Sequence, residues 1–425
     1  MHIYFSGIGG TAIGPLSIIA KEAGHEVSGS DLKNSDFLQD MIKKGYDAHI
    51  GQTKEQIQKI HEENPIDWLV HSSAVTKSNP EFKFALKHNI RISKRSELIN
   101  KILEDKGLKM VAVAGTHGKT TTTAMIIWLM QKLNQPISYS VGTTLSFGAV
   151  SQYVEGSEYF VYEADEFDRN FLDYNPYTSL LTSVEYDHPD TYPSVADYKA
   201  AFSEFVSNSK HVVGWEKDIK NNSLQAKNVM ALPDNFEMVE KIDLFGEHNR
   251  QNACLAVLTV NKLLPQHSTE KLLDIIAQFP GTDRRLEKIK DNLYSDYAHH
   301  PSEIIATIKT AKEITKASGK KLAIVYQPHQ NVRQHEINDT SGYTNTFNNV
   351  DRLYWLPTYM SREKEELSVI SPQDLARSVR DPKDIVFAEL NSELVENIQQ
   401  SIVDGYLVVL MAAGDLDTFI RSALA

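Results

Sequence analysis

Short apolar runs alternate with amphipathic stretches along most of the chain. Runs that predict buried strands occupy residues 2–6, 26–30, 68–74, 90–93, 110–114, 159–162, 180–184, 292–297, 321–326, 351–356 and 406–411. Stretches with helical spacing follow several of them, at 11–23, from 96, at 120–129 and at 302–318. Strands that alternate with helices form parallel sheets covered on both faces. The pattern therefore predicts an α/β protein.

A chain of 425 residues is too long for a single hydrophobic core, so we expect more than one domain. Asp105-Lys106-Gly107 has the composition of a linker, and Phe279 to Arg285 that of a hinge. The glycine motifs GIGGTA at 7–12 and GTHGKT at 115–120 each follow an apolar run, and strands alternate with helices again after 284. We accordingly predict three domains: an N-terminal Rossmann-like domain at 1–106, a central P-loop ATPase-like domain at 107–283, and a C-terminal Rossmann-like domain at 284–425.

Composition narrows the classes of function. The hydrophobic fraction of 41% and charged fraction of 24% are those of an ordinary globular protein. A net charge of −12 argues against a nucleic-acid or lipid-surface partner. No apolar run reaches membrane-spanning length, and because residues 2–6 already form an expected strand, we expect no signal peptide. The single cysteine, Cys254, excludes an internal disulfide, suits a small buried core position, and favours a reducing cytoplasm as the location.

The strongest chemical signal is the stretch VAVAGTHGKTTTTA at 111–124. An apolar strand breaks at Gly115 and a helix begins near Thr120, which is the strand, glycine loop and helix of a phosphate-binding loop. Small residues let backbone N–H groups approach an anion, and the helix N-terminus adds positive potential. Lys119 is expected to reach the β- and γ-phosphates, with the Thr120 hydroxyl on Mg²⁺. The first glycine of the commoner motif is replaced by Val113.

A second glycine motif, GIGGTA at 7–12, follows the first predicted strand, and Asp31 ends the next one. This arrangement is typical of a βαβ unit that holds a diphosphate, with the acidic residue on a ribose. The motif does not identify the nucleotide, and NAD is the default interpretation. Ser72 and Ser73, at the end of another strand, are placed to contact a sugar or phosphate, although an ordinary turn would explain them equally well.

Acidic residues follow two strands of the central region. Glu163, Asp165, Glu166 and Asp168 form one group, and Asp187-His188 follows the strand at 180–184. Because parallel strand ends converge, and hard oxygen ligands suit Mg²⁺, we predict a metal site with His188 as a candidate ligand. A solvated acidic turn is the alternative.

Further polar groups cluster near the C-terminal half. GEHNRQN at 246–252 opens a helix and could hold an adenine or ribose, although helix capping alone would explain Asn249. The pair Arg284-Arg285 suits phosphate chemistry. Strand ends in the last domain carry DYAHHP at 296–301, QPHQ at 327–330 and AGD at 413–415.

Taken together, these motifs resemble the Mur ligase family over nearly the whole chain. The motifs that carry the resemblance, in family order, are GIGG at 7–10, GSDL at 29–32, SSA at 72–74, GTHGKTTTT at 115–123, EADE at 163–166, Asp187-His188, His248-Asn249, Gly281 with Arg284-Arg285, Tyr297 with HHP at 299–301, and QPH at 327–329.

The resemblance implies an ATP-dependent, ADP-forming ligase. ATP would phosphorylate the lactyl carboxylate of UDP-N-acetylmuramate, and the amine of an amino acid, expected to be L-alanine, would attack the acyl phosphate.

The resemblance also implies which residues contact the substrates and the metal. The UDP-sugar would bind to Gly7, Gly9, Gly10, Thr11, Asp31, Ser72 and Ser73. ATP would bind to Gly115, Thr116, His117, Gly118, Lys119, Thr120, Thr121, His248, Asn249, Asn252, Arg284 and Asp296. The amino acid would bind to Tyr297, His329 and Arg333. Mg²⁺ would bind to Thr120, Glu163 and His188, and the catalytic residues would be Lys119, Glu163 and His188.

Two departures from the family pattern concern recognition. Gln330 stands where an arginine is expected, and Ser295 replaces one carboxylate of an acidic pair. A cousin ligase that attaches a preformed peptide to the same UDP-sugar in cell-wall recycling is the alternative function. A non-catalytic or NAD-linked nucleotide-binding protein is the alternative from another class. We expect a monomer or homodimer with small-molecule substrates and neither nucleic acid nor membrane as a partner.

Overall fold

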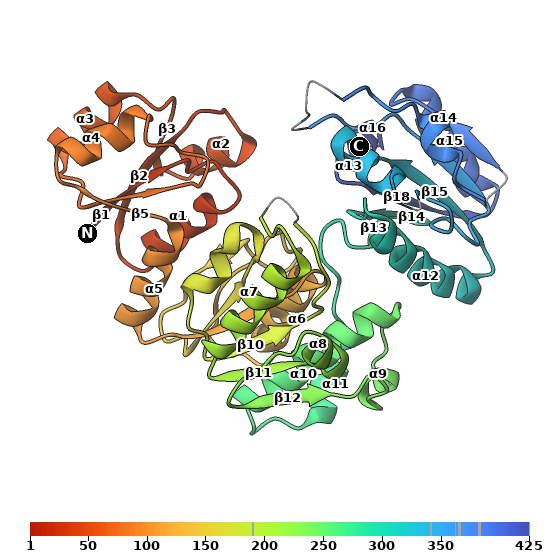
Figure 1. Cartoon of the computed structure of the whole chain (residues 1–425), viewed down its shortest axis with the longest axis horizontal. Helices are drawn as coiled ribbons and strands as arrows, with labels where there is room; N and C mark the ends of the chain where they lie inside the picture. Colours follow the sequence, from red (N-terminus) through yellow and green to blue (C-terminus); the bar gives the residue numbers. More distant parts are fainter. Residues whose placement is uncertain (189–190, 341, 362, 364–366, 381–383, 425) are drawn as a thin grey trace. The chain divides into compact units, whose positions relative to one another are not determined.

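The computed structural model describes residues 1–188, 191–340, 342–361, 363, 367–380 and 384–424. It contains three sheets, one in each predicted domain (Figure 1). The chain forms two compact units: one comprises Met1–Ile242 with Asn252–Phe279, and the other Asp243–Gln251 with the chain from Pro280. Within the described ranges, none of the helices has the length and apolar character needed to cross a membrane.

The N-terminal sheet has five parallel strands in the order β3-β2-β1-β4-β5. Its strands are β1 (His2–Ser6), β2 (Glu26–Asp31), β3 (Asp47–Ile50), β4 (Trp68–His71) and β5 (Arg91–Ser93), and its helices are α1 (Ile13–Glu22), α2 (Asp36–Lys43), α3 (Lys54–Glu63), α4 (Pro80–Lys87) and α5 (Arg95–Lys106). Helix α1 packs on one face and α3 and α4 on the other. The strand order reverses between β1 and β4, which is where ligands bind in such sheets.

The central sheet has the order β12-β11-β10-β6-β9-β7-β8 and is parallel except for β8. Its strands are β6 (Lys109–Ala114), β7 (Ser138–Ser140), β8 (Ser151–Gln152), β9 (Tyr159–Glu163), β10 (Thr178–Leu181), β11 (His211–Trp215) and β12 (Val229–Leu232). The helical segments are α6 (Lys119–Lys132), η1 (Phe167–Asp173), α7 (Val195–Ser207), α8 (Glu216–Asn221), α9 (Met238–Lys241), α10 (Glu247–Leu263) and α11 (Thr269–Ile276). Strand β6 lies between β9 and β10, so the loops after these three strands meet.

The C-terminal sheet has the order β13-β14-β18-β15-β16-β17, with only β13 antiparallel among the described strands. Its strands are β13 (Glu287–Lys290), β14 (Leu293–Asp296), β15 (Lys321–Gln327), β16 (Arg352–Trp355), β17 (Ile385–Phe387) and β18 (Tyr406–Ala412), and its helices are α12 (Pro301–Ser318), α13 (Asn331–Asn338), α14 (Pro372–Ala376), α15 (Ser392–Val403) and α16 (Leu416–Leu424). One face packs on α12, α13 and α14, and the other on α15 and α16.

The expected α/β fold is confirmed. The predicted strands differ from the observed ones at their ends, and the sequence pattern did not predict β3, β7, β8, β11, β12, β13 or β17. The strand predicted at 180–184 runs instead from Thr178 to Leu181, because the chain then turns beneath the phosphate-binding loop. The predicted linker at 105–107 lies at the end of α5, where Gly107 adopts the left-handed conformation (φ 63°) that ends the helix. The domain boundaries themselves stay a prediction.

Candidate active site

The loop between β6 and α6 requires its glycines. Gly115 has a φ of 132°, and a Cβ there would lie 2.4 Å from the Thr182 hydroxyl oxygen and 2.6 Å from the Ser183 carbonyl oxygen. Gly118 is the N-cap of α6 with a φ of 86°, and its Cβ would lie 2.7 Å from Oδ1 of Asn252. The structure thus places Asn252, predicted as an ATP contact, directly against the loop.

Lys119 is the first residue of α6, and its ammonium group is neutralised by a buried carboxylate. Its Nζ donates to Oε2 and Oε1 of Glu166, at 2.8 and 3.0 Å, and to the Gly115 carbonyl oxygen at 2.6 Å. Glu166 is completely buried, and the Lys119 side chain is 14% exposed. Burial opposes charge on both groups, but their mutual attraction outweighs it. The pKa of Lys119 is therefore raised, and that of Glu166 is lowered.

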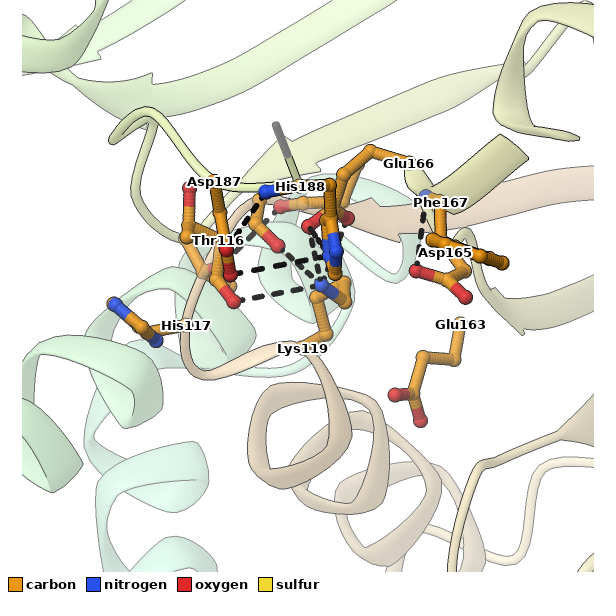
Figure 2. Close-up of polar contacts among 12 residues, drawn as sticks. Thr116, His117, Lys119, Glu163, Asp165, Glu166, Phe167, Asp187 and His188 are labelled. Atoms are coloured by element: carbon orange, nitrogen blue, oxygen red, sulfur yellow. Dashed lines mark hydrogen bonds and ion pairs between the residues drawn. The ribbon is translucent and has the colours of Figure 1, made fainter. Parts of the chain in front are cut away.

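Figure 2 shows that Lys119, Glu166 and His188 point toward one another, whereas Glu163 points away from this cluster. Nε2 of His188 lies 3.6 Å from Oε1 of Glu166 and 3.9 Å from Oδ2 of Asp187. Burial disfavours the imidazolium, but these carboxylates outweigh that effect and raise the pKa of His188. His188 also has a positive φ of 57°, a backbone conformation that is uncommon for residues other than glycine.

Glu163 ends β9 beside Val113 of β6, and both of its carboxylate oxygens are engaged. Oε1 accepts from the Thr120 hydroxyl and Oε2 from the Gly142 N–H, each at 2.7 Å. The predicted metal ligands therefore fall into two places. Thr120 and Glu163 contact each other, whereas ligand atoms of His188, Asp165 and Glu166 lie within 4.8 Å of one another.

The donors in both places fit Mg²⁺, which prefers carboxylate and hydroxyl oxygens. In the second group, Lys119 holds both oxygens of Glu166, so a cation there would have to compete with this ammonium group. Glu163 with Thr120 is free of such competition from Lys119. The assignment of Thr120, Glu163 and His188 as metal ligands stays a prediction.

The remaining loop residues are anchored to the segment after β10. The hydroxyl of Thr116 donates to the Glu185 carbonyl oxygen at 2.7 Å, and the His117 N–H donates to the Ser183 hydroxyl at 2.9 Å. Thr121 is buried in the first turn of α6. The Thr116 N–H also donates, to the Ser183 carbonyl oxygen at 2.9 Å, so these contacts fix the loop backbone through its own N–H groups.

The predicted UDP-sugar residues meet where the N-terminal strand order reverses. A Cβ on Gly7 (φ 94°) would lie 3.0 Å from Cβ of Ser72, so the loops after β1 and β4 touch. The Gly10 N–H donates to the Gly7 carbonyl oxygen at 3.1 Å, and Thr11 is exposed. Asp31 turns toward the glycine loop: Oδ2 accepts from the Gly9 N–H and Oδ1 from the Lys33 N–H, both at 3.0 Å. The side chain of Ser73 is also exposed.

The predicted amino-acid residues gather at the carboxyl ends of β14 and β15. The rings of Tyr297 and His299 lie 5.5 Å apart, and those of His299 and His329 5.6 Å apart. Nη1 of Arg333 lies 3.2 Å from Nε2 of His299. Burial lowers the pKa of His299, so its neutral ring accepts from Arg333. Within the described ranges, Arg333 forms no ion pair with a carboxylate.

Four predicted ATP contacts lie in the same unit as this cluster. Asp296 is buried, with Oδ1 accepting from the Ala298 N–H at 2.8 Å and Oδ2 from the Leu286 N–H at 2.7 Å. Arg284 has a φ of 54° and lies 4.8 Å from the ring centre of Tyr297. Nδ2 of Asn249 donates to the Phe245 carbonyl oxygen at 3.0 Å, and His248 precedes it in the first turn of α10.

The sequence analysis did not identify three residues that contact the predicted site residues. Glu166 belongs to the acidic motif at 163–166, which does not reveal that it binds Lys119. His299 belongs to HHP, which does not reveal that it contacts Arg333 beside the aromatic rings. The ring of Tyr359 stacks on that of His329, with centroids 5.7 Å apart. The EADE and HHP motifs point to the first two residues but not to these contacts, and Tyr359 lies in no motif.

Comparisons with known proteins give one consistent family. Residues 2–106 match the model "Mur ligase family, catalytic domain", 113–228 the "Mur ligase middle domain" and 284–414 the "Mur ligase, glutamate ligase domain". The chain is 30% identical to UDP-N-acetylmuramate–L-alanine ligase of Clostridium botulinum, an alignment that covers 98% of this chain and 95% of that protein. It is 29% identical to the ligase of the same name from Clostridium acetobutylicum, over 97% and 95%.

Two solved structures share the fold. UDP-N-acetylmuramate-alanine ligase of Thermotoga maritima aligns with a TM-score of 0.77 and 23% identity, over 100% of this chain and 98% of that one. A murein peptide ligase from Psychrobacter arcticus aligns with a TM-score of 0.64 and 20% identity over the same shares.

Proposed function

The chain belongs to the Mur ligase family, and from that premise we propose that it joins L-alanine to the lactyl carboxylate of UDP-N-acetylmuramate with ATP as the energy source. The reaction would form ADP and supply a precursor for peptidoglycan synthesis. The observation that carries this proposal is the convergence of Lys119, Glu163, Glu166 and His188 on the phosphate-binding loop. The experiment that tests it is an ADP-release assay in which UDP-N-acetylmuramate or L-alanine is omitted.

Activation of the acceptor explains why this site is built around a cation. A carboxylate is a poor electrophile, and an acyl phosphate converts its oxygen into a leaving group. The lactyl carboxylate and the γ-phosphate are both anions and repel each other, so their negative charge must be neutralised where they meet. Lys119, at the positive end of α6, would supply one such charge, and the loop N–H groups would position the phosphates.

Bound Mg²⁺ ions would screen the phosphate oxygens, and we propose that Thr120, Glu163 and His188 hold these ions at the two places that the residues occupy. Asp165 and Glu166 supply further oxygen donors beside His188. Because Glu166 already neutralises Lys119, a bound phosphate would have to share this ammonium group with Glu166 or replace it. The Lys119–Glu166 contact therefore defines the position at which the γ-phosphate is expected.

The amino acid would bind in the C-terminal unit, with its carboxylate facing Arg333. Nη1 of Arg333 contacts the neutral imidazole of His299, which leaves the guanidinium charge uncompensated by that partner. Tyr297, His329 and the stacked Tyr359 would enclose a small side chain.

Cys254 is buried and forms no disulfide, which suits a reducing cytoplasm, and we propose the cytoplasm as the location.

We predict that the N-terminal glycine loop binds UDP-N-acetylmuramate and not NAD(H), because the diphosphate of UDP meets the same backbone amides. Asp31 would then face the uridine end of the ligand. Calorimetric titration should give a binding signal with UDP-N-acetylmuramate and none with NAD⁺ or NADH. A tight NAD(H) signal would instead support an oxidoreductase.

A further inference from the structure

One face of the N-terminal sheet carries polar side chains where a buried parallel sheet is usually apolar. Tyr4 and Ser6 of β1 and Ser30 of β2 are completely buried, and their side chains project toward α4. Opposite them lies Glu81, in the first turn of α4, with no exposed surface. A buried carboxylate of this kind needs several donors, and this sheet face supplies them.

All three hydroxyl groups donate to Glu81. Oε1 accepts from Tyr4 at 2.6 Å and from Ser30 at 2.5 Å, and Oε2 accepts from Ser6 at 2.6 Å. The Glu81 N–H in turn donates to Oδ1 of Asn79, the N-cap of α4, at 2.8 Å. Glu81 therefore links two adjacent strands to the start of a helix.

The backbone carbonyl groups of Ser6 and Ser30 hold the glycine loop and the loop after β4. The Ser30 carbonyl oxygen accepts from the N–H groups of Gly7 and Ile8, at 2.8 and 3.0 Å. The Ser6 carbonyl oxygen accepts from the Ser72 N–H at 3.0 Å, and Ser6 directly precedes Gly7. The groups held by Glu81 thus set the positions of both loops proposed to contact the UDP-sugar.

A second path closes the network from the other side. Nε2 of Gln52, which follows β3, donates to the Ser6 hydroxyl oxygen at 3.1 Å, and Nδ2 of Asn79 donates to Oε1 of Gln52 at 2.7 Å. The hydroxyl of Ser6 is consequently fixed as a donor to Glu81. A polar network buried this completely is a poor source of stability compared with apolar packing, but it specifies one geometry.

We propose that Glu81 is a positioning residue for the UDP-sugar, acting through Ser6 and Ser30 on the glycine loop at 7–11 and on Ser72. It does not contact the ligand, and its effect is on the geometry of the backbone that does. This inference rests on the proposed function, since it assumes that the N-terminal loops bind a UDP-sugar.

The test is the Glu81→Gln variant, which keeps the shape of the side chain. Glutamine offers one acceptor oxygen, so one of the three hydroxyls must lose its acceptor. We expect the dissociation constant for UDP-N-acetylmuramate, measured by calorimetry, and its KM to rise about tenfold. The KM for ATP and the kcat at saturating UDP-sugar should stay unchanged, a division that general loss of structure would not produce.

Two further comparisons keep the inference falsifiable. Glu22→Gln makes the same chemical change at an exposed carboxylate of the same domain, bonded to the Tyr153 N–H, and should bind UDP-N-acetylmuramate normally. If Glu81→Gln does not fold, Ser6→Ala and Ser30→Ala test the same contacts one at a time. In a folded Glu81→Gln protein, adding Ser6→Ala should cost less than it does in the wild type, because the two residues act together.

The outcomes separate the two proposals. Wild-type protein that fails to bind UDP-N-acetylmuramate would overturn the proposed function. Wild-type protein that binds it, together with a Glu81→Gln variant of equal affinity, would overturn only the role of Glu81. A variant that weakens ATP and the UDP-sugar alike would also overturn that role, since the effect would then be on folding rather than on the loop.

Discussion

Replacement of Lys119 by alanine should lower the rate of ADP formation by roughly 10²–10³-fold, because it removes the cation at the transferring phosphoryl group. Nζ of Lys119 lies within 3.0 Å of both oxygens of Glu166 and 2.6 Å from the Gly115 carbonyl oxygen, so its ammonium group is fixed beside the loop. Steady-state ADP release at saturating UDP-N-acetylmuramate and L-alanine measures the effect.

The variant must be shown to fold, because loss of Lys119 leaves the buried Glu166 without its strongest partner. Lys119→Arg keeps the charge and can still pair with Glu166, yet it changes the reach and shape of the cation, so we expect it to fold and to lose activity. Lys132→Ala, on the exposed end of the same helix, is the matched control and should be fully active. A folded Lys119→Ala protein with near-normal turnover would refute the assignment of the phosphate-binding loop.

Replacement of Arg333 by alanine should abolish the use of L-alanine. The Arg333 guanidinium contacts His299, whereas those of Arg284 and Arg285 lie over the ring of Tyr297. Loss of Arg333 would therefore remove the cation that we propose for the substrate carboxylate. ADP release titrated with L-alanine should show no saturation in this variant. Arg377→Ala removes an exposed arginine of the same unit, paired with Asp374, and should behave as the wild type.

Gln330→Arg is the companion variant. Glutamine brings no charge at this position, whereas an arginine would add a bidentate, charge-assisted contact to the carboxylate. We therefore expect a high KM for L-alanine in the wild type and a KM about tenfold lower in the variant, with the KM for ATP unchanged. If Gln330→Arg has no effect and Arg333→Ala is harmless, the amino acid binds elsewhere.

The sequence was sufficient to predict the architecture because ligand-binding loops in parallel sheets follow strand ends. Glycines at 7–10 and 115–118, and the carboxylates at 163–166, each come directly after an apolar run. The sheet orders place β1 beside β4, and β6 between β9 and β10. Residues separated by dozens of positions therefore meet at one edge, as the motifs predicted.

The side-chain pairings could not be predicted, because they depend on which way each carboxylate turns. EADE contains three acidic residues, and the sequence does not indicate that Glu166 binds Lys119 whereas Glu163 binds Thr120. Asp31, expected on a ribose, accepts from the Gly9 N–H. Such choices follow from local backbone geometry, which composition does not encode.

Ser295 shows the same limit. As a replacement for a carboxylate, it was expected to affect recognition of ATP or the amino acid. In the structure it is buried and donates to Oδ1 of Asp417 at 2.5 Å, on the face covered by α16. Arg421 also bonds Asp417. Because neighbouring strand residues point to opposite faces, Ser295 is directed away from Asp296, and we attribute to it a structural role.

The central claim is that one ternary reaction consumes ATP, UDP-N-acetylmuramate and L-alanine. The measurement that tests it most directly is ADP release by the purified chain with Mg²⁺, with each substrate omitted in turn and with L-alanine replaced by other amino acids or by a preformed peptide. Our account predicts ADP release, and the matching UDP-N-acetylmuramoyl–L-alanine product, only when all three substrates are present. Turnover with the peptide and none with L-alanine, or no turnover under any of these conditions, would contradict it.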